Sequence, residues 1–244
     1  TNQRSSIGWG QGSTGEVIVT GPGSTWTLKG ILYVGLQGEG QLTITDGGKV
    51  IGGHHLYIAD QATGNPEVKS EVLVAGGGEL QLTNDLDIGR KGYGVLRIES
   101  GGQVTNRSSS IGWGQGSTGE VIVTGANSSW TLSRELYVGA GWENGTTEGD
   151  GYLTIADGGR VNARSVTIER DADTKGVLAI GAQPDDPAAG PGFLSVDPDN
   201  KISFWQRKRY SRLQPSRFEL RIRFCNFGLR EYRTPCWDDH FDRR

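Results

Sequence analysis

Four charged residues are spaced so that they could act together in catalysis. Asp85 and Asp87 lie two positions apart, on one side of a strand, and Arg90 and Lys91 follow directly. Paired carboxylates beside a basic partner are the groups that enzymes use for acid–base cleavage of polysaccharides. However, Asp87 corresponds to Tyr33 of an equivalent strand, which is an outward position. We therefore expect Asp87 to be a solvated surface residue, and we predict no catalytic residue.

Metal and cofactor sites are not indicated. His54 and His55 are adjacent, so they point to opposite faces of a strand, and residues 1–200 contain no other histidine and no cysteine. The turns at Asp46 and Asp157 lack the spacing of calcium-binding β-rolls. The glycine-rich residues 8–15 lack the lysine and the following helix of a phosphate-binding loop. We predict no metal and no cofactor.

Four tryptophans form two pairs with a constant separation of 104 residues, Trp9 with Trp113 and Trp26 with Trp130. Aromatic rings in a row could form a platform for sugars. Recurrence at equivalent positions favours packing within corners or the core instead. We expect the second arrangement.

These tryptophans belong to an internal repeat. Residues 5–21, SSIGWGQGSTGEVIVTG, recur without change at residues 109–125. Each copy ends in a short strand, such as residues 16–20, which is entered and left through glycines. A strand this short cannot bury its apolar face alone, so it must stack on a copy of itself. The repeat therefore predicts a solenoid.

Weaker matches extend the repeat to a unit of 54 residues, the distance from Leu42 to Leu96. Each unit offers roughly six short strands between glycine-rich corners, which fits about two coils of a right-handed parallel β-helix. Asp-Gly pairs, such as the one at Asp46, supply the positive φ that a tight corner needs. The inward positions are predicted to be Val17 and Val19, Leu42 and Ile44, Leu96 and Ile98, and Leu153 and Ile155. Seven extra residues in the stretch AGWENGTTEGD should bulge from a corner.

Composition supports this all-β class. The chain has 40 glycines among 244 residues, no methionine and no helical pattern of apolar residues. A propeller is the alternative all-β arrangement, but its strands are usually longer and no blade signature recurs. No stretch predicts a membrane-spanning helix or a signal peptide. The chain begins in mid-repeat, as expected of a fragment or of a gene that lost its start.

Charge and glycine content differ between the body of the chain and its C-terminal tail. Residues 1–182 are predicted to be β-helical repeats, residues 183–203 a Pro/Asp/Ala-rich linker and last strand, and residues 204–244 a basic tail without repeats that is disordered. The formal charge is −10 for residues 1–200 and +7 for residues 201–244. An acidic body argues against nucleic acid as a partner. Only Gly228 of the 40 glycines lies in the tail, which also holds both cysteines.

Two interpretations of the tail remain open. A basic segment is typical of an arm that binds nucleic acid or a membrane. We favour a frameshift. Read one base later, with permitted codons, the tail from Phe204 can contain GTLVF, which resumes the rhythm of the repeat.

The combined motifs G-x-L-T-I-x-D-G-G-x-V, IGWGQGSTGEVIVTG and SSWTLSRELYVG resemble the repeat of bacterial autotransporter (type V secretion) passengers, which also occurs in PEP-CTERM surface proteins. The resemblance covers about residues 5–181. It implies a right-handed β-helix that is displayed outside the cell by a C-terminal outer-membrane barrel and commonly serves adhesion. No series of alternating strands of about ten residues follows residue 200, so we expect no barrel in this chain.

The functional hypothesis is a non-catalytic, secreted surface stalk at the outer membrane. Its partners would be a host-cell or matrix surface, or neighbouring bacterial cells, and its uncapped ends could self-associate. The alternative is a polysaccharide lyase or hydrolase, because parallel β-helices also carry pectin-cleaving enzymes.

Overall fold

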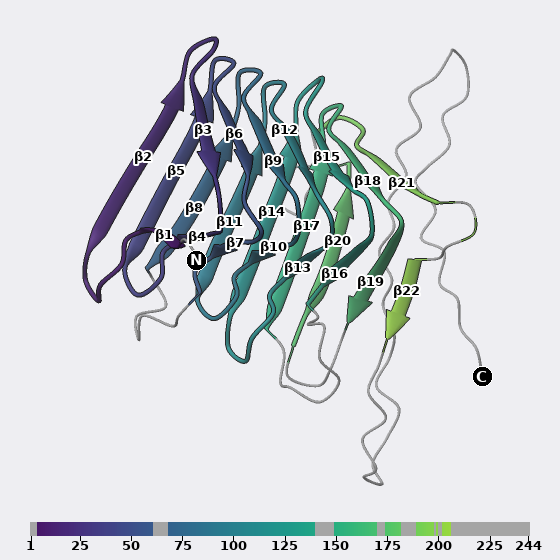
Figure 1. Ribbon diagram of the computed structural model, residues 1–244. Helices are drawn as coiled ribbons and strands as arrows, with labels where there is room; N and C mark the ends of the chain where they lie inside the picture. Colours follow the sequence, from purple (N-terminus) through teal and green to yellow (C-terminus); the bar gives the residue numbers. More distant parts are fainter. Residues whose placement is uncertain are drawn as a thin grey trace, which may run out of the picture.

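The computed structural model describes residues 4–60, 68–139, 149–169, 174–181, 189–197, 199 and 202–205. All regular structure in these residues is β-strand, and the strands follow one another along one axis in the order of the sequence (Figure 1). The predicted all-β class is confirmed. No helix among the described residues is long and apolar enough to cross a membrane.

Three parallel sheets form the sides of the solenoid, and we call them sheets A, B and C. Sheet A consists of β1 (Arg4–Ile7), β4 (Ile31–Val34), β7 (Leu56–Ile58), β10 (Leu86–Ile88), β13 (Ser109–Ile111), β16 (Glu135–Val138), β19 (Ser165–Glu169) and β22 (Ile202–Trp205). Sheet B consists of β2 (Thr14–Thr20), β5 (Glu39–Thr45), β8 (Lys69–Val74), β11 (Tyr93–Ile98), β14 (Thr118–Thr124), β17 (Asp150–Ala156) and β20 (Gly176–Ile180). Sheet C consists of β3 (Thr25–Leu28), β6 (Lys49–Gly52), β9 (Glu79–Leu82), β12 (Gln103–Asn106), β15 (Ser129–Leu132), β18 (Arg160–Ala163) and β21 (Phe193–Val196).

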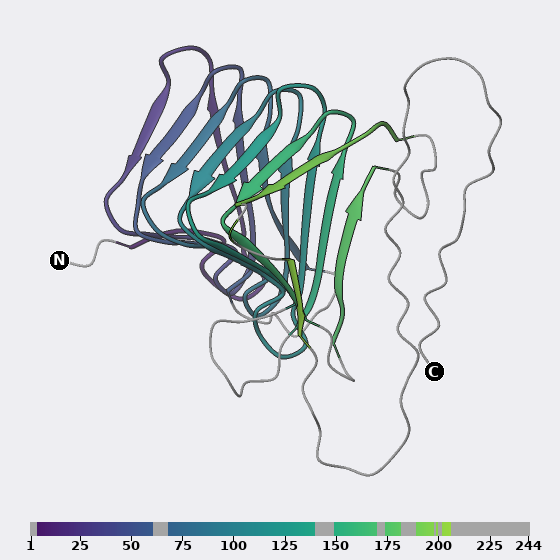
Figure 2. The ribbon, with the colours of Figure 1, turned by 90° about the vertical axis from the view of Figure 1, so that its right-hand side faces the viewer.

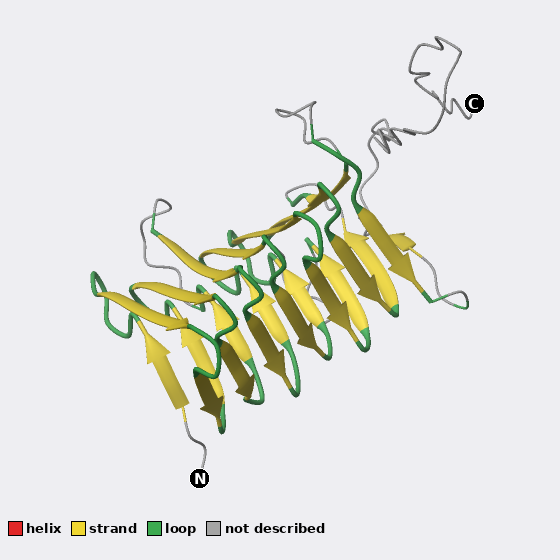
Figure 3. Cartoon of the chain, turned by 90° about the horizontal axis from the view of Figure 1, so that it is seen from above, coloured by secondary structure: helices red, strands yellow, loops and turns green. Residues whose placement is uncertain are grey.

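One coil is one strand from each sheet in sequence, so β1, β2 and β3 form the first coil and β13, β14 and β15 the fifth. Every strand pairs in parallel with its equivalent one coil away, as in β2 with β5 and β14 with β17. Figure 2 shows the three-sided coils stacked side by side, and Figure 3 shows the strands of each sheet running across the long axis. The predicted pairing one coil away is confirmed.

The core is a set of apolar columns inside the coils. In sheet B, Val17 lies beside Leu42 and Val19 beside Ile44, and Leu153 and Ile155 continue the same two columns. Outward neighbours alternate with these residues because successive side chains of a strand point to opposite faces. All eight predicted inward residues lie in this core or, like Val17, pack against it.

The corners use the predicted turn residues. Asp46 has a φ of 51° and Gly47 a φ of 78°, and Asp157 and Gly158 repeat this pair with 50° and 89°. Aspartate tolerates the left-handed region and glycine enters it without steric cost. Thr20 and Thr124 each donate from the hydroxyl to the corner aspartate of the next coil, at 3.2 and 3.0 Å.

The last described coil falls where the sequence predicts a linker and last strand. β21 pairs with β18, and β22 pairs with β19 and includes Phe204 and Trp205. Both strands continue sheets of the solenoid. The remainder of the predicted tail, residues 206–244, and most of the predicted insertion, residues 140–148, lie outside the described residues.

Candidate functional site at the corner of sheets A and B

The structure places Asp87 in the outward column of sheet A, as the comparison with Tyr33 predicts. Tyr33 pairs with Tyr57, Tyr57 with Asp87, and Asp87 with Ser110. The expected solvation is wrong, because Asp87 is only 6% exposed. Arg90 of the same coil lies against it, and Tyr57 and Ser110 lie beside it in the neighbouring strands.

Arg90 is the centre of this cover. Its guanidinium forms a salt bridge with Asp60, and its Nε lies 3.9 Å from Oδ2 of Asp87. The same guanidinium lies over the Tyr57 ring, 4.2 Å from its centroid, and over the Trp113 ring, 5.0 Å away. Tyr57 lies in β7 of the third coil and Asp60 follows that strand, whereas Arg90 follows β10 of the fourth coil and Trp113 follows β13 of the fifth. The cluster therefore ties three coils together, and we call these five residues the Arg90 clamp.

The charges of the clamp are mutually stabilised. Burial alone lowers the pKa of Arg90, but the hydrogen bond and the charge of Asp60, helped by Asp87, outweigh it and the pKa is raised. A guanidinium held this way does not exchange protons near neutral pH. Asp87 therefore faces a fixed positive charge, with Nε of Arg90 3.9 Å from its Oδ2.

Asp85 has a different environment. It faces His55, with 3.7 Å between Oδ2 and Nδ1, while the imidazole stacks on Tyr57 with 5.6 Å between ring centroids. Burial lowers the pKa of His55 more than the Asp85 charge raises it, so the ring is neutral at pH 7. Asp85 and Asp87 therefore point at different partners.

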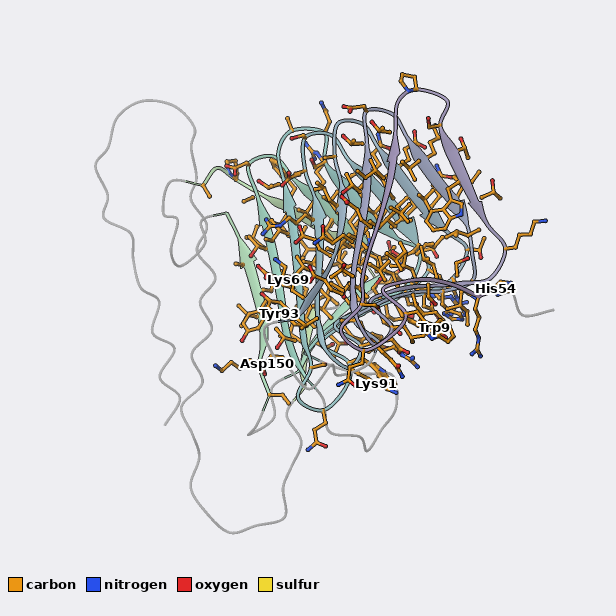
Figure 4. The ribbon with its side chains drawn as sticks, turned by 90° about the vertical axis from the view of Figure 1, so that its left-hand side faces the viewer. Trp9, His54, Lys69, Lys91, Tyr93 and Asp150 are labelled. Atoms are coloured by element: carbon orange, nitrogen blue, oxygen red, sulfur yellow. The ribbon has the colours of Figure 1, made fainter. Side chains whose placement is uncertain are left out.

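The remaining predicted candidates are spread over the surface. Lys91 is exposed between sheets A and B of the fourth coil, as Trp9 is in the first coil, and His54 is exposed in the turn between β6 and β7 (Figure 4). Within the described residues, no three His, Cys, Asp or Glu side chains gather in a group that could hold a metal ion. Lys69, Tyr93 and Asp150 share an outward column of sheet B, which Figure 4 shows along one face.

The tryptophans behave as predicted at three of four positions. Trp130 is fully buried, Trp26 packs against the core, and Trp113 stacks on Arg90. Trp9 contradicts the expectation, because it is 64% exposed. Trp113 covers a side chain of the coil before it, and for Trp9 the structure describes no earlier coil.

A buried polar network was missed by sequence reasoning. The Trp130 indole donates from Nε1 to Oδ1 of Asn106 at 2.8 Å, and Asn106 donates from Nδ2 to the Ser108 carbonyl at 2.7 Å and to Ser109 Oγ at 2.8 Å. The signal was the polar Asn106 at an inward position of β12, followed by Ser109 where the neighbouring coils carry Leu86 and Leu136. The network joins the fourth and fifth coils.

Two known proteins are similar to the chain over part of its length. No protein-family profile matches the chain, and no solved structure does. The chain is 30% identical over 154 residues, 60% of its length, to the adhesin BmaC autotransporter of Brucella suis biovar 1 (strain 1330). It is 26% identical over 179 residues, 66% of its length, to the uncharacterized lipoprotein YdeK of Escherichia coli (strain K12). The chain spans 4% of the first protein and 12% of the second.

Proposed function

We propose that the chain is a non-catalytic, surface-exposed segment of an autotransporter passenger, a stiff β-helical stalk that serves adhesion. Two findings support the proposal. The fold is a parallel solenoid, and the sequence is similar to an adhesin autotransporter over 60% of the chain. The partners would be a host-cell or matrix surface, or neighbouring bacterial cells, which the stalk meets after export to the cell surface.

The observation that carries the non-catalytic assignment is the Arg90 clamp. The best candidate catalytic carboxylate, Asp87, is buried against an arginine that Asp60 and two aromatic rings hold in place. Side chains used in this way hold neighbouring coils of the solenoid together. A stable solenoid with flat sheet faces suits a stalk that presents the same surface repeatedly along its length. The acidic body, with a formal charge of −10 over residues 1–200, argues against nucleic acid as the surface it meets.

Two assays test this proposal. The purified chain, immobilised on beads, should retain epithelial cells or extracellular matrix above the level of an acidic control protein. In the second assay, the chain should release no product from polygalacturonate or related polyanions. Turnover that is lost in both Asp85→Asn and Asp87→Asn variants would contradict the proposal and establish the polysaccharide-cleaving alternative.

A further inference from the structure

Three arginines of successive coils lie in one row at the corner between sheets C and A. Arg107 follows β12 of the fourth coil, Arg134 follows β15 of the fifth, and Arg164 follows β18 of the sixth. Main-chain hydrogen bonds fix the row, because the Arg134 N–H donates to the Arg107 carbonyl at 2.8 Å and the Arg164 N–H to the Arg134 carbonyl at 2.9 Å. All three residues are exposed. We call this row the arginine ridge.

The arginine ridge has no carboxylate partner, although the body of the chain is acidic. Elsewhere cations pair with carboxylates, as Lys49 does with Glu79 at 2.8 Å and Arg97 with Glu71 at 3.1 Å. Among the described residues, no carboxylate forms an ion pair with a guanidinium of the ridge. Like charges on neighbouring strands repel each other, and these strands are about 4.8 Å apart. The fold therefore leaves the positive charge of the ridge uncompensated.

The residues that border the ridge do not neutralise it. The Arg107 guanidinium donates to the side-chain oxygen of Asn84 at 3.4 Å, which is a neutral acceptor. Glu135, at the start of β16, accepts a hydrogen bond from the Ser108 hydroxyl at 3.4 Å. The row ends in the seventh coil, where Asp197 takes the equivalent position after β21. The ridge thus spans three coils, or about 10 Å along the long axis.

Sheet C borders the ridge with a strip of polar side chains, which is the second observation. The outward positions of its strands in the fourth to sixth coils, which we call the polar strip, are Gln103, Thr105, Ser129, Thr131, Arg160 and Asn162. None of these six residues is acidic, and all are exposed except the half-buried Ser129. Arg160 lies over the Phe193 ring of the next coil, 4.4 Å from its centroid. The strip therefore offers hydroxyl and amide groups beside the row of free cations.

These two features together fit a sulfated polysaccharide. Guanidinium groups bind anionic oxygens in pairs, and hydroxyl and amide side chains form hydrogen bonds with sugar hydroxyls. The rise of about 4.8 Å per coil is close to the length of one sugar ring in an extended polysaccharide. Successive sugars of such a chain are rotated relative to one another. A polymer with several sulfates per repeat can therefore turn an anion toward each coil, which a polymer with one anion per sugar cannot.

Two other polyanions fit less well. Proteins that bind single-stranded nucleic acid stack the bases on aromatic side chains, and the ridge and the polar strip contain none. Proteins that bind an anionic membrane surface usually insert apolar side chains into it, and these nine residues include no apolar one. The surface thus lacks the contacts that either alternative requires beyond charge.

We propose that the arginine ridge and the polar strip form a binding surface for a linear, sulfated polysaccharide. The polymer lies along the long axis of the solenoid, with its sulfates on Arg107, Arg134 and Arg164 and its hydroxyls on the strip. The proposal rests on the proposed function for the place where the chain meets this polymer, a host-cell or matrix surface. It adds the chemistry that such a surface must carry.

The test measures binding of the full chain to a fluorescent heparin dodecasaccharide. Replacing all three ridge arginines by glutamine should weaken binding on the order of thirtyfold. It should also lower the slope of log affinity against log salt concentration by about two, because fewer counterions are released. The matched control replaces three exposed cations elsewhere by glutamine, namely Arg4, Lys91 and Lys175. It should change binding by less than about twofold, since distant exposed charges are screened. Both variants keep the basic tail, so their difference measures the ridge.

A second pair of variants tests the polar strip. Thr131→Val removes a hydroxyl beside the ridge without changing the shape of the side chain, and it should weaken binding about threefold. Thr27→Val makes the same change in the first coil, in the same outward column but away from the ridge, and it should leave binding unchanged. Urea unfolding checks the fold. The variant with three glutamines in the ridge should be at least as stable as the parent, because it removes repulsion between neighbouring coils.

Three results would overturn the proposal. Equal affinity of the ridge variant and the control variant would assign heparin binding to other cations. Equal binding of desulfated heparin would remove sulfate from the recognition. Tighter ridge-dependent binding of single-stranded DNA or of phosphatidylserine vesicles would assign the ridge to a nucleic acid or a membrane.

This proposal and the proposed function fail separately. Retention of cells by the chain without ridge-dependent heparin binding would overturn the ridge proposal and leave adhesion intact. Ridge-dependent heparin binding without retention of cells would support the ridge proposal and contradict adhesion.

Discussion

Residues 5–21 and 109–125 have the same sequence but different surroundings. In the second stretch β14 pairs with β11 on one side and β17 on the other, whereas β2 pairs with β5 alone among the described strands. Val121 and Val123 are fully buried, while Val17 is half-buried. Trp113 stacks on an arginine and Trp9 faces solvent.

The comparison separates what the sequence specifies from what neighbouring coils supply. Strand positions, the inward or outward direction of each side chain and the turns are the same in both stretches. The degree of burial and the polar partners differ. In a solenoid each coil contacts only its neighbours, so stability is close to a sum of interfaces between adjacent coils. Identical changes in the two stretches should therefore have unequal effects.

The largest difference is expected for a charge placed in the core. Val121→Asp should lower the free energy of unfolding by about 4 kcal/mol, because the carboxylate is enclosed by apolar residues on both sides. Val17→Asp should cost about 1 kcal/mol, since water can reach it from the open edge. Urea unfolding of the two variants measures both values. Equal losses would show that β2 is covered as completely as β14.

The buried network between the fourth and fifth coils should give the next effect. Asn106→Leu leaves the Trp130 indole N–H without its acceptor and should cost about 2 kcal/mol. The double variant Asn106→Leu with Trp130→Phe should cost less than the sum of the two single variants, because it removes the donor together with its acceptor. Unfolding free energies of the two single variants and the double variant test this, and simple additivity would contradict the hydrogen bond as the cause.

A smaller contrast is expected at the corners. Trp113→Ala removes one ring of the Arg90 clamp and should cost about 1.5 kcal/mol, whereas Trp9→Ala should cost less than about 0.5 kcal/mol. Thermal unfolding of the two variants, compared with the parent chain, measures the difference. A cost at Trp9 equal to that at Trp113 would mean that Trp9 already has a partner in the isolated chain.

The smallest effect depends on pH. Burial and the hydrogen bond to Glu120 raise the pKa of Tyr93 to about 12 from an ordinary value of 10. The unfolded chain therefore loses this proton at lower pH, so the contribution is complete below pH 10 and is lost as the pH rises toward 12. Tyr93→Phe should flatten this part of the stability profile. Urea unfolding between pH 9 and 12 measures it, and an unchanged profile would contradict the assignment.

Much of the fold could be predicted because its determinants are local. The alternation in β5 and β17 indicated Leu42, Ile44, Leu153 and Ile155 as inward residues, and the Asp-Gly corner at Asp46 indicated its turn. The register also followed, because a slip of one residue would turn every apolar side chain outward.

The candidate site was harder to predict because it joins coils that are distant in sequence. The outward direction of Asp87 was correct, but its neighbour Arg90 is held by Asp60 and Trp113, which lie in the coils on either side. No local pattern shows that a side chain of one coil will lie over the next. Trp9 shows the same limit, because its sequence context is identical to that of Trp113.

Hydrogen exchange of the chain alone tests the central claim most directly, because both stretches are measured in one molecule under one condition. If neighbouring coils set burial, the amides of residues 119–123 should exchange only through global unfolding, and those of residues 15–19 should exchange faster by on the order of a hundredfold. Equal protection of the two stretches would contradict the account.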